Sequence, residues 1–190
     1  DSFIKYAFVT DTPKALNELV DSLALMPLDI EKKLNIAAEM FAVCPAFLGN
    51  KAPFFTPYEA QLFAKNIYNY TQENLLTRPI SILSFGIGDG RRIYEKIMFC
   101  RALGIKNLQL TGIEYDNKVN EQARGLFPEI NIITQDLLTW NNQDSSFKEL
   151  IEKVDFIDAS FIFHEIYSFG GRPSPEAPID HSLGQAKMTS

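Results

Sequence analysis

The sequence predicts an α/β fold: a doubly wound, mostly parallel sheet with an N-terminal helical segment. After Pro79, short apolar runs alternate with stretches of helical periodicity, which is the pattern of βαβ units. Before Pro79, apolar residues recur only at helical spacing. The chain has 190 residues, of which 46% are hydrophobic, so it is long enough and apolar enough to bury a core of this kind.

These patterns divide the chain into three parts. Residues 1–78 are expected to form a helical cap segment, and residues 79–168 the domain that contains the sheet. Residues 169–190 are rich in glycine and proline, which predicts an extended or disordered tail. The alternative is a tail that packs against the domain as a covering arm.

Three helices are expected in the first part, each with its own start signal. Thr12 followed by Pro13 has the form of an N-cap with proline at the first helical position. Asp29 can cap a second helix, which must end before Pro45. Thr56-Pro57-Tyr58-Glu59 is a capping box, and the helix that it opens should run to about Leu75.

Strands and helices alternate in the second part. The expected elements are, in order, a strand at 80–85, a helix from about 91 that Gly104 ends, a strand at 107–113, a helix to 124 that Asp116 caps, a strand at 130–134, a helix at 147–152 and a strand at 154–159. This order predicts a parallel sheet with its connections on the two faces.

Composition and charge narrow the class of protein. The formal net charge of −6 gives no overall basic surface for nucleic acid, although a local basic patch stays open. No apolar run approaches the length of about 18 residues that a membrane span needs, and Asp1–Lys5 lacks the features of a signal peptide. Cys44 and Cys100 form neither a disulfide framework nor a metal cluster. We therefore expect a cytoplasmic protein without a metal, which binds neither membrane nor nucleic acid.

Polar or glycine-rich residues follow each expected strand. The first strand runs into Ser84-Phe85-Gly86-Ile87-Gly88-Asp89-Gly90, the second ends at Glu114, the third just before Asp136, and the fourth at Asp158-Ala159-Ser160. Ligands of open parallel sheets bind at the carboxyl ends of the strands. These residues should therefore form one row along one edge of the sheet.

The row has the chemistry of a nucleoside site. A glycine turn lets a ligand approach the backbone closely, and the helix that follows presents N–H groups and a positive dipole end. Glu114 lies 24 residues beyond Gly90 and can accept hydrogen bonds from both ribose hydroxyls, while Asp136 can accept one from an exocyclic amine. Each acid could instead be a solvated loop residue or a helix cap. Together the features indicate an adenosine-bearing ligand with an anionic or zwitterionic end.

Two common phosphate-binding motifs do not match. In the dinucleotide fingerprint the third small residue permits close packing of helix and strand, but Arg91 stands at that position, which disfavours a nicotinamide cofactor. The Gly-Lys-Ser/Thr ending of a Walker A loop is absent.

Residues 80–168 resemble the first half of a class I S-adenosylmethionine-dependent methyltransferase, a family with a Rossmann-like core. The resemblance implies that Gly86, Gly88 and Gly90 wrap the methionine portion of S-adenosylmethionine, that Glu114 binds its ribose and that Asp136 meets its adenine amine. The full set of implied cofactor-binding residues is Ser84, Phe85, Gly86, Ile87, Gly88, Gly90, Glu114, Asp136, Leu137 and Ser160.

His164-Glu165 follows the fourth strand and is the candidate catalytic pair. A histidine with an unperturbed pKa of about 6.5 can take a proton from a substrate near neutral pH. The alternative is that His164 packs or caps a helix. The resemblance also allows Tyr58 and Gln61 to close over the cofactor, and the alternative there is an aromatic core.

Two departures from the family pattern shape the functional hypothesis. Ser84 stands where the family has an acid, and the 22 residues after Ser168 cannot hold three more strands, so the core is expected to be incomplete. The sequence predicts methyl transfer from S-adenosylmethionine to a small molecule with an N or O nucleophile. The alternative is a methyltransferase-like binding or scaffolding module without turnover. The oligomeric state stays open.

Overall fold

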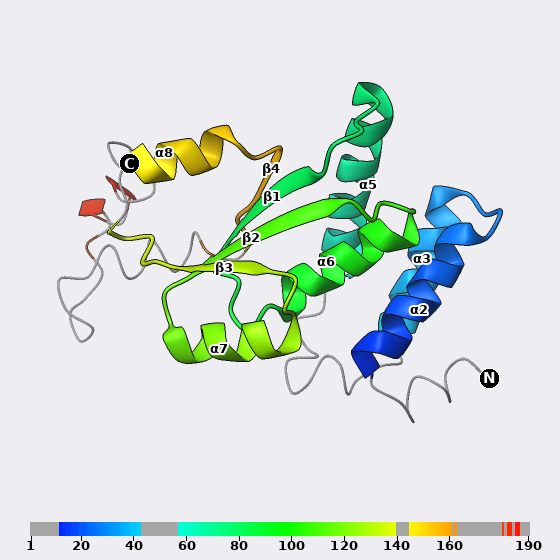
Figure 1. Ribbon diagram of the computed structural model, residues 1–190, viewed down its shortest axis with the longest axis horizontal. Coiled ribbons are helices and arrows are strands. Elements are labelled where there is room, and N and C mark those ends of the chain that lie inside the picture. Colours follow the sequence, from blue (N-terminus) through cyan, green and yellow to red (C-terminus); the bar gives the residue numbers. More distant parts are fainter. Residues whose placement is uncertain are drawn as a thin grey trace. The chain divides into compact units, whose positions relative to one another are not determined.

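A computed structural model describes residues 12–42, 57–139, 145–160, 162, 180, 182–183 and 185–186. The chain forms two compact units (Figure 1). The first, here called the helical unit, comprises Asp1–Arg78 and Arg91–Asn107; the second, the sheet unit, comprises Pro79–Gly90 and Leu108–Ser190. Among the described residues, no helix has both the length and the apolar character that crossing a membrane requires.

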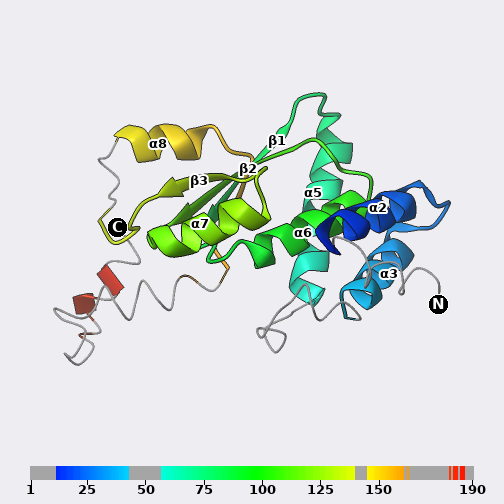
Figure 2. The same ribbon diagram turned by 60° about the horizontal axis from the view of Figure 1, so that its bottom comes forward.

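The helical unit contains four described helices. They are α2 (Thr12–Leu25), α3 (Ile30–Ala42), α5 (Pro57–Asn74) and α6 (Arg91–Ala102). The helix α6 contacts the other three, and α2 and α3 lie side by side (Figures 1 and 2). All four helices were expected from the sequence. Three of them precede the sheet in the chain, whereas α6 follows the first strand and packs with them.

Local signals explain where these helices begin and end. The Asp29 carboxylate accepts a hydrogen bond from the Lys32 N–H at 2.8 Å, which confirms it as the cap of α3. Gly104 follows α6 with φ of +84°, the left-handed conformation that ends a helix. The expected capping role of Thr56, like Cys44, lies outside the described residues.

Apolar side chains at helical spacing fill the core of this unit, and the rings of Phe41 and Phe99 stack at 5.5 Å. Cys100 is fully buried in it, which raises the pKa of its thiol.

In α5 the buried residues are Ala60, Ala64 and Ile67. Small residues four apart present a flat face to a neighbouring helix. Tyr58 is 75% exposed, so the alternative that placed it in an aromatic core is wrong.

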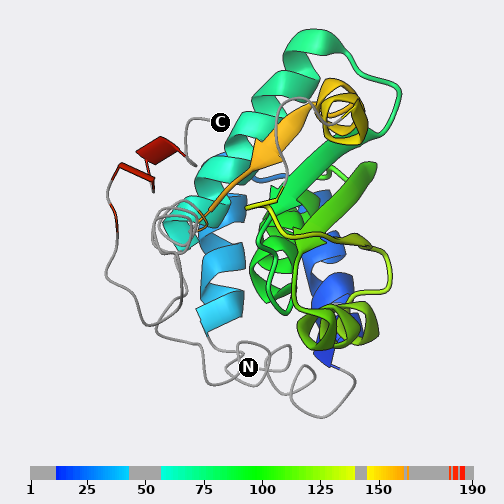
Figure 3. The same ribbon diagram turned by 90° about the vertical axis from the view of Figure 1, so that its left-hand side faces the viewer.

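The sheet unit confirms the predicted α/β class. Its strands are β1 (Ile80–Phe85), β2 (Leu108–Glu114), β3 (Asn131–Thr134) and β4 (Phe156–Asp158). All three pairings are parallel, and the order is β3-β2-β1-β4 (Figure 3). A doubly wound sheet has this order in its first four strands, with its topological switch point between β1 and β4.

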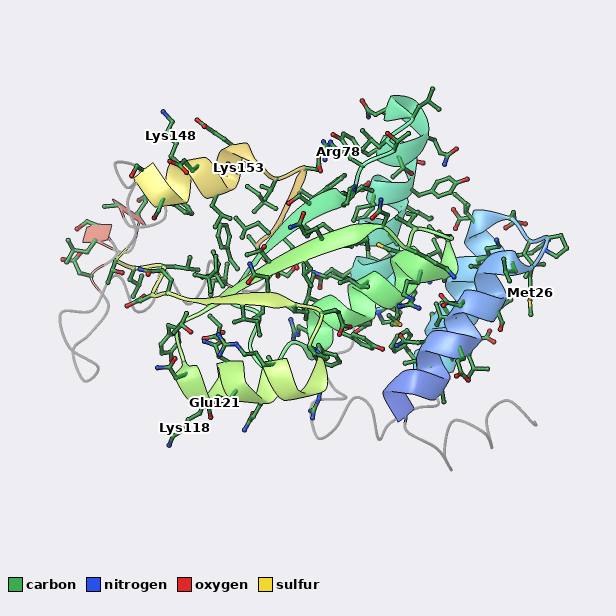
Figure 4. All side chains as sticks on the ribbon, in the orientation of Figure 1. Met26, Arg78, Lys118, Glu121, Lys148 and Lys153 are labelled. Atoms are coloured by element: carbon green, nitrogen blue, oxygen red, sulfur yellow. The ribbon has the colours of Figure 1, made fainter. Side chains whose placement is uncertain are left out.

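Two described helices accompany the sheet, α7 (Asn117–Leu126) and α8 (Ser145–Glu152). The helix α7 packs on β2 and β3 (Figure 2), and Lys118 and Glu121 project from it away from the sheet (Figure 4). Asp116 accepts hydrogen bonds from two N–H groups in the first turn of α7, as its expected role as a cap requires.

Strand β4 is shorter than the expected strand at 154–159. Asp155 precedes it and is held by Ser81, whose carbonyl accepts from the Asp155 N–H at 2.8 Å and whose N–H donates to the Asp155 carboxylate at 2.9 Å. The second of these bonds uses a side chain instead of the strand ladder, so regular pairing begins only at Phe156. Most of the expected tail at 169–190 lies outside the described residues.

Candidate functional site

In the glycine turn after β1, every second residue has a left-handed backbone conformation. Gly86, Gly88 and Gly90 have φ of +61°, +55° and +80°. Residues with a Cβ adopt this region at a cost of roughly 1–2 kcal/mol each, whereas glycine adopts it freely. The three glycines are therefore required by the path of the chain, before any ligand is considered.

The three positions differ in what surrounds them. A Cβ on Gly86 would lie 2.6 Å from Ile162 Cδ1, and a Cβ on Gly90 would lie 2.9 Å from Phe127 Cδ2. A Cβ on Gly88 would meet no atom within 4 Å. Gly86 and Gly90 thus make room for neighbouring side chains of the sheet unit. Gly88 instead presents bare backbone to open space, where a ligand can approach it.

Strand β2 fixes the shape of this turn. The Ile113 carbonyl accepts hydrogen bonds from the N–H groups of Gly86 at 2.8 Å and Ile87 at 3.2 Å. The Ile87 side chain is buried over Gly112, where a Cβ would lie 2.6 Å from Ile87 Cδ1. The expected site residue Ile87 therefore packs the turn onto β2 through its side chain and can offer a ligand its backbone.

The Glu114 side chain also holds the glycine turn to β2. Its Oε2 accepts from the Gly88 N–H at 3.0 Å, and its Oε1 accepts from the N–H groups of Tyr115 at 2.9 Å and Asp116 at 3.2 Å. A carboxylate has about four acceptor positions, so these three bonds leave about one. Binding both hydroxyls of a ribose would require one backbone bond to give way. Glu114 is thus a structural clamp at the same position where sequence reasoning placed a ribose-binding acid.

The end of β3 lies beside Glu114. Asp136 is exposed, and its carboxylate accepts from the Leu138 N–H at 2.9 Å, while Leu137 between them is half-buried. Asn120 of α7 is fully buried and donates to the Glu114 carbonyl at 3.2 Å and to Thr134 Oγ1 at 2.9 Å. Sequence reasoning missed Asn120, because an asparagine inside an amphipathic helix gives no signal of what it bridges.

Polar groups also gather at the ends of β1 and β4. Ser84 pairs with Asp158 in the register of the two strands, and the Ser84 hydroxyl donates to Asp158 Oδ2 at 3.1 Å. The Ser160 hydroxyl donates to Asp158 Oδ1 at 2.6 Å. The expected site residues Ser84 and Ser160 therefore meet on one carboxylate, which the predicted site left out. Its signal in the sequence is an acid at the end of the fourth strand.

Phe85 has a packing role in the structure, and the two catalytic candidates are not among the described residues. The Phe85 ring lies 6.3 Å from the Phe147 ring of α8, so this side chain contributes to packing within the sheet unit. His164 and Glu165 lie outside the described residues, and their roles remain predictions. In the part of the chain that the structure describes, no group of three or more His, Cys, Asp or Glu residues could hold a metal ion.

The structure therefore places the described site residues on one edge of the sheet unit. From β3 to β4 this edge carries Asp136, Glu114, the glycine turn and the Ser84–Asp158–Ser160 group. Carboxylates and bare backbone can accept hydroxyl, amine and ammonium hydrogens from a ligand. The edge is thus suited to an elongated ligand with donors at both ends.

Comparison with known proteins gives structural neighbours alone. No protein-family model matches the chain, and no curated protein matches it. A solved structure of the plantazolicin methyltransferase BpumL with SAH aligns over 91% of this chain and 72% of that chain, at 18% identity and a TM-score of 0.37. Another, with a triazolic desmethylPZN analog and SAH, aligns over 90% and 71%, at 18% identity and a TM-score of 0.38.

A third BpumL structure, with a monoazolic desmethylPZN analog and SAH, aligns over 68% of this chain at 21% identity and a TM-score of 0.35. That alignment spans 46% of the BpumL chain, less than half its length. SAH and the desmethylPZN analogs are ligands of BpumL. The α/β class of the present chain follows from its own strand order and parallel pairings.

Proposed function

We propose that this protein binds S-adenosylmethionine and transfers its methyl group to a small molecule with an N or O nucleophile. One observation carries the proposal: Gly88 presents left-handed backbone to open space while its N–H is held by Glu114. A turn of this shape can admit a ligand against its backbone with no side chain in the way. The resemblance noted from the sequence supplies the identity of that ligand.

The residues present fit such a cofactor. Gly86, Gly88 and Gly90 would line its methionine portion, and Glu114 has acceptor capacity for a ribose hydroxyl. Asp136 is exposed and can accept from an adenine amine, with Leu137 next to it. When bound, S-adenosylmethionine supplies an electrophilic methyl group on a sulfonium centre.

The part played by this chain is mainly positioning. A nucleophile held in line with a methyl group reacts over a lower activation barrier, because its orientation is already fixed. In well-oriented systems this effect lowers the barrier by about 7–11 kcal/mol. We assign proton removal from the acceptor to His164, with Glu165 beside it in sequence. A cytoplasmic location and a small-molecule acceptor belong to the same proposal.

Ser84 favours a second candidate function, a binding or scaffolding module without turnover. In the resembling family an acid stands at this position, and a serine carries no charge to hold a cofactor. The two functions differ in one measurable property, since only an enzyme consumes S-adenosylmethionine.

Calorimetric titration of the chain with S-adenosylhomocysteine tests the proposal, with NAD as the control ligand. Micromolar binding of S-adenosylhomocysteine alone supports it, and binding of NAD alone, or of neither, contradicts it. Incubation with S-adenosylmethionine and a panel of small amines and phenols then distinguishes an active methyltransferase from a binding or scaffolding module without turnover. Formation of S-adenosylhomocysteine above the rate without acceptor marks an enzyme.

A further inference from the structure

We propose that Asn120 of α7 is a positioning residue that sets the preference of the site for an adenine base. Its buried amide joins the ends of β2 and β3, from which Glu114 and Asp136 would meet the ligand. The inference rests on the proposed function, in which Asp136 meets the adenine amine. All of the residues concerned belong to the sheet unit.

The Asn120 side chain bridges two strand ends. Glu114 is the last residue of β2 and Thr134 the last residue of β3, and the two are partners in the parallel register. Asn120 Nδ2 donates to the Glu114 carbonyl at 3.2 Å and to Thr134 Oγ1 at 2.9 Å. A carbonyl can only accept, so the amide nitrogen must face Glu114, and both of its hydrogens are used. The amide therefore links the two strand ends in one fixed orientation.

Apart from these bonds, asparagine is an unfavourable residue for this position. Asn120 is fully buried inside α7, and asparagine is a poor helix former. None of the described residues donates a hydrogen bond to its Oδ1. A buried acceptor without a partner lowers stability, and a leucine of similar size would avoid that loss. The two donor bonds at the strand ends are what asparagine provides here and an apolar residue does not.

The turn that carries Asp136, residues 135–139, is held together by bonds of its own. The Asp136 carboxylate accepts from the Leu138 N–H at 2.9 Å, and the Asp136 carbonyl accepts from the Thr139 N–H at 3.1 Å and from the Thr139 hydroxyl at 2.8 Å. The turn is attached to β2 by the Gln135 N–H, which donates to the Glu114 carbonyl at 3.1 Å. The position of the Asp136 carboxylate therefore follows the position of the ends of β2 and β3.

Asn120 acts on both of these points. It shares the Glu114 carbonyl with Gln135, and it bonds the last residue of β3, from which the turn continues. A hydrogen bond forms over a narrow range of donor–acceptor distance, about 2.7–3.2 Å for an N–H donor. A small displacement of the turn should therefore weaken the contact between Asp136 and the adenine amine more than it weakens contacts with the rest of the ligand.

The ratio of the affinities for two ligands tests this role. We would titrate wild type and variants with S-adenosylhomocysteine and with S-inosylhomocysteine, in which a carbonyl oxygen replaces the exocyclic amine of the base. Wild type should bind S-adenosylhomocysteine about tenfold more tightly, because a hydrogen bond to a charged group distinguishes the two ligands. Asn120→Leu should reduce this ratio to about threefold or less. A purely structural role would weaken the binding of both ligands equally and leave the ratio unchanged.

A second variant and a control accompany Asn120→Leu. Thr134→Val removes one acceptor of the amide at an exposed strand position, and it covers the case in which Asn120→Leu fails to fold. It should lower the ratio as well, and combining the two changes should lower it no further than Asn120→Leu alone. Arg124→Leu is the matched control, because Arg124 also donates from α7 to β3, to the Ile132 carbonyl at 3.1 Å, away from the strand end. This variant should keep the wild-type ratio.

An unchanged ratio in folded Asn120→Leu, or in Thr134→Val, would overturn the inference. An equal fall of the ratio in Arg124→Leu would also overturn it, since the effect would then come from the packing of α7. Equal affinity of the wild type for the two ligands would contradict the inference and leave the proposed function intact. Absence of S-adenosylhomocysteine binding by the wild type would remove the proposed function and this inference with it.

Discussion

The helical unit and the sheet unit both hold charged side chains in buried or half-buried positions, but these side chains have different kinds of partner in the two units. In the helical unit, Lys96 pairs with Glu59 at 2.6 Å and Arg101 with Asp21 at 2.7 Å. Each pair joins one helix to another, so its charges compensate one another. In the sheet unit, Glu114 and Asp158 lie at strand ends and accept from backbone N–H groups and hydroxyls.

We interpret the ion pairs of the helical unit as groups that stabilise the fold, and the acids of the sheet edge as groups that bind ligand. Burial tends to raise the pKa of Asp21, but the hydrogen bonds and charges of Arg101 and Lys106 outweigh it and lower that pKa, as in a pair that joins helices. At the sheet edge, the donors to Glu114 are backbone N–H groups, and the Ser84 and Ser160 hydroxyls donate to Asp158. Changes to helical-unit charges should therefore alter unfolding and leave ligand affinity unchanged, whereas changes at the sheet edge should alter ligand affinity.

The largest effect is expected at the glycine turn. Gly88→Val would fill the open space beside the backbone, and we expect binding of S-adenosylhomocysteine to weaken by more than about 100-fold. Gly104→Val is the matched control, because Gly104 also has positive φ and open space around it but lies at the end of α6. Both variants should lose at least about 1–2 kcal/mol of stability from backbone strain. Near-native affinity in Gly88→Val, measured by calorimetry, would contradict the assignment of the turn.

The next largest effect concerns Glu95, a buried acid of α6. Burial and the neighbouring Glu59 raise the pKa of Glu95 from 4.5 to about 8, against the opposing effect of Lys96 and Arg92. The folded state then holds a proton that the unfolded state releases above pH 4.5. This contribution to stability is complete below pH 4.5 and is lost as the pH rises through 8, by an amount on the order of 5 kcal/mol.

Glu95→Gln should remove this dependence. Thermal unfolding of the wild type and the variant between pH 4.5 and 8.5 would show the variant gaining on the wild type as the pH rises, with 1 kcal/mol worth roughly 2–4 °C. Parallel curves would show that Glu95 titrates normally. The affinity for S-adenosylhomocysteine should be the same in both proteins.

Breaking one buried ion pair should have a somewhat smaller effect. Glu59→Gln leaves the Lys96 ammonium, whose side chain is 5% exposed, without this partner. Complete burial would cost about 3–5 kcal/mol, but the Glu59 side chain is 30% exposed, so we expect about 2 kcal/mol in urea unfolding. Glu73→Gln is the same change at an exposed position of α5 and should cost under about 0.5 kcal/mol. A change in ligand affinity in Glu59→Gln would break the separation between the two units.

The smallest effect sharpens the role of Glu114, which serves both structure and binding. Glu114→Ala removes the acceptor of three backbone N–H bonds, and we expect about tenfold weaker binding of S-adenosylhomocysteine and a stability loss of about 1–2 kcal/mol. Glu121→Ala, on the outer face of α7, should change neither (Figure 4). An unaltered affinity in Glu114→Ala would leave Glu114 a structural residue alone.

Much of the fold could be predicted because its signals are local. Strand β1 at 80–85 was predicted with its observed bounds, and the caps at Asp29 and Asp116 act within one helical turn of the residues they contact. The parallel direction of the strands followed from the alternation of strands and helices. The pattern could not predict that α6 packs with the N-terminal helices, because packing partners depend on contacts distant in sequence.

The sequence predicted which residues lie at the candidate site better than it predicted which of them contact one another. The glycine spacing and the acids at strand ends fixed which residues share an edge, since parallel strands end together. The bond from Gly88 to Glu114 spans 26 residues, and that from Ser84 to Asp158 spans 74. These pairings depend on sheet register, which no local motif encodes. Asp158 was therefore missed as a partner, although its strand end was recognised.

The central claim is that one edge of the sheet unit holds S-adenosylmethionine through the glycine turn. Backbone amide NMR of the chain during titration with S-adenosylhomocysteine tests this most directly. We predict shifts concentrated at Gly86, Gly88, Glu114 and Asp136, with α2 and α3 unaffected. Shifts confined to the helical unit, or none at saturating ligand, would contradict the account.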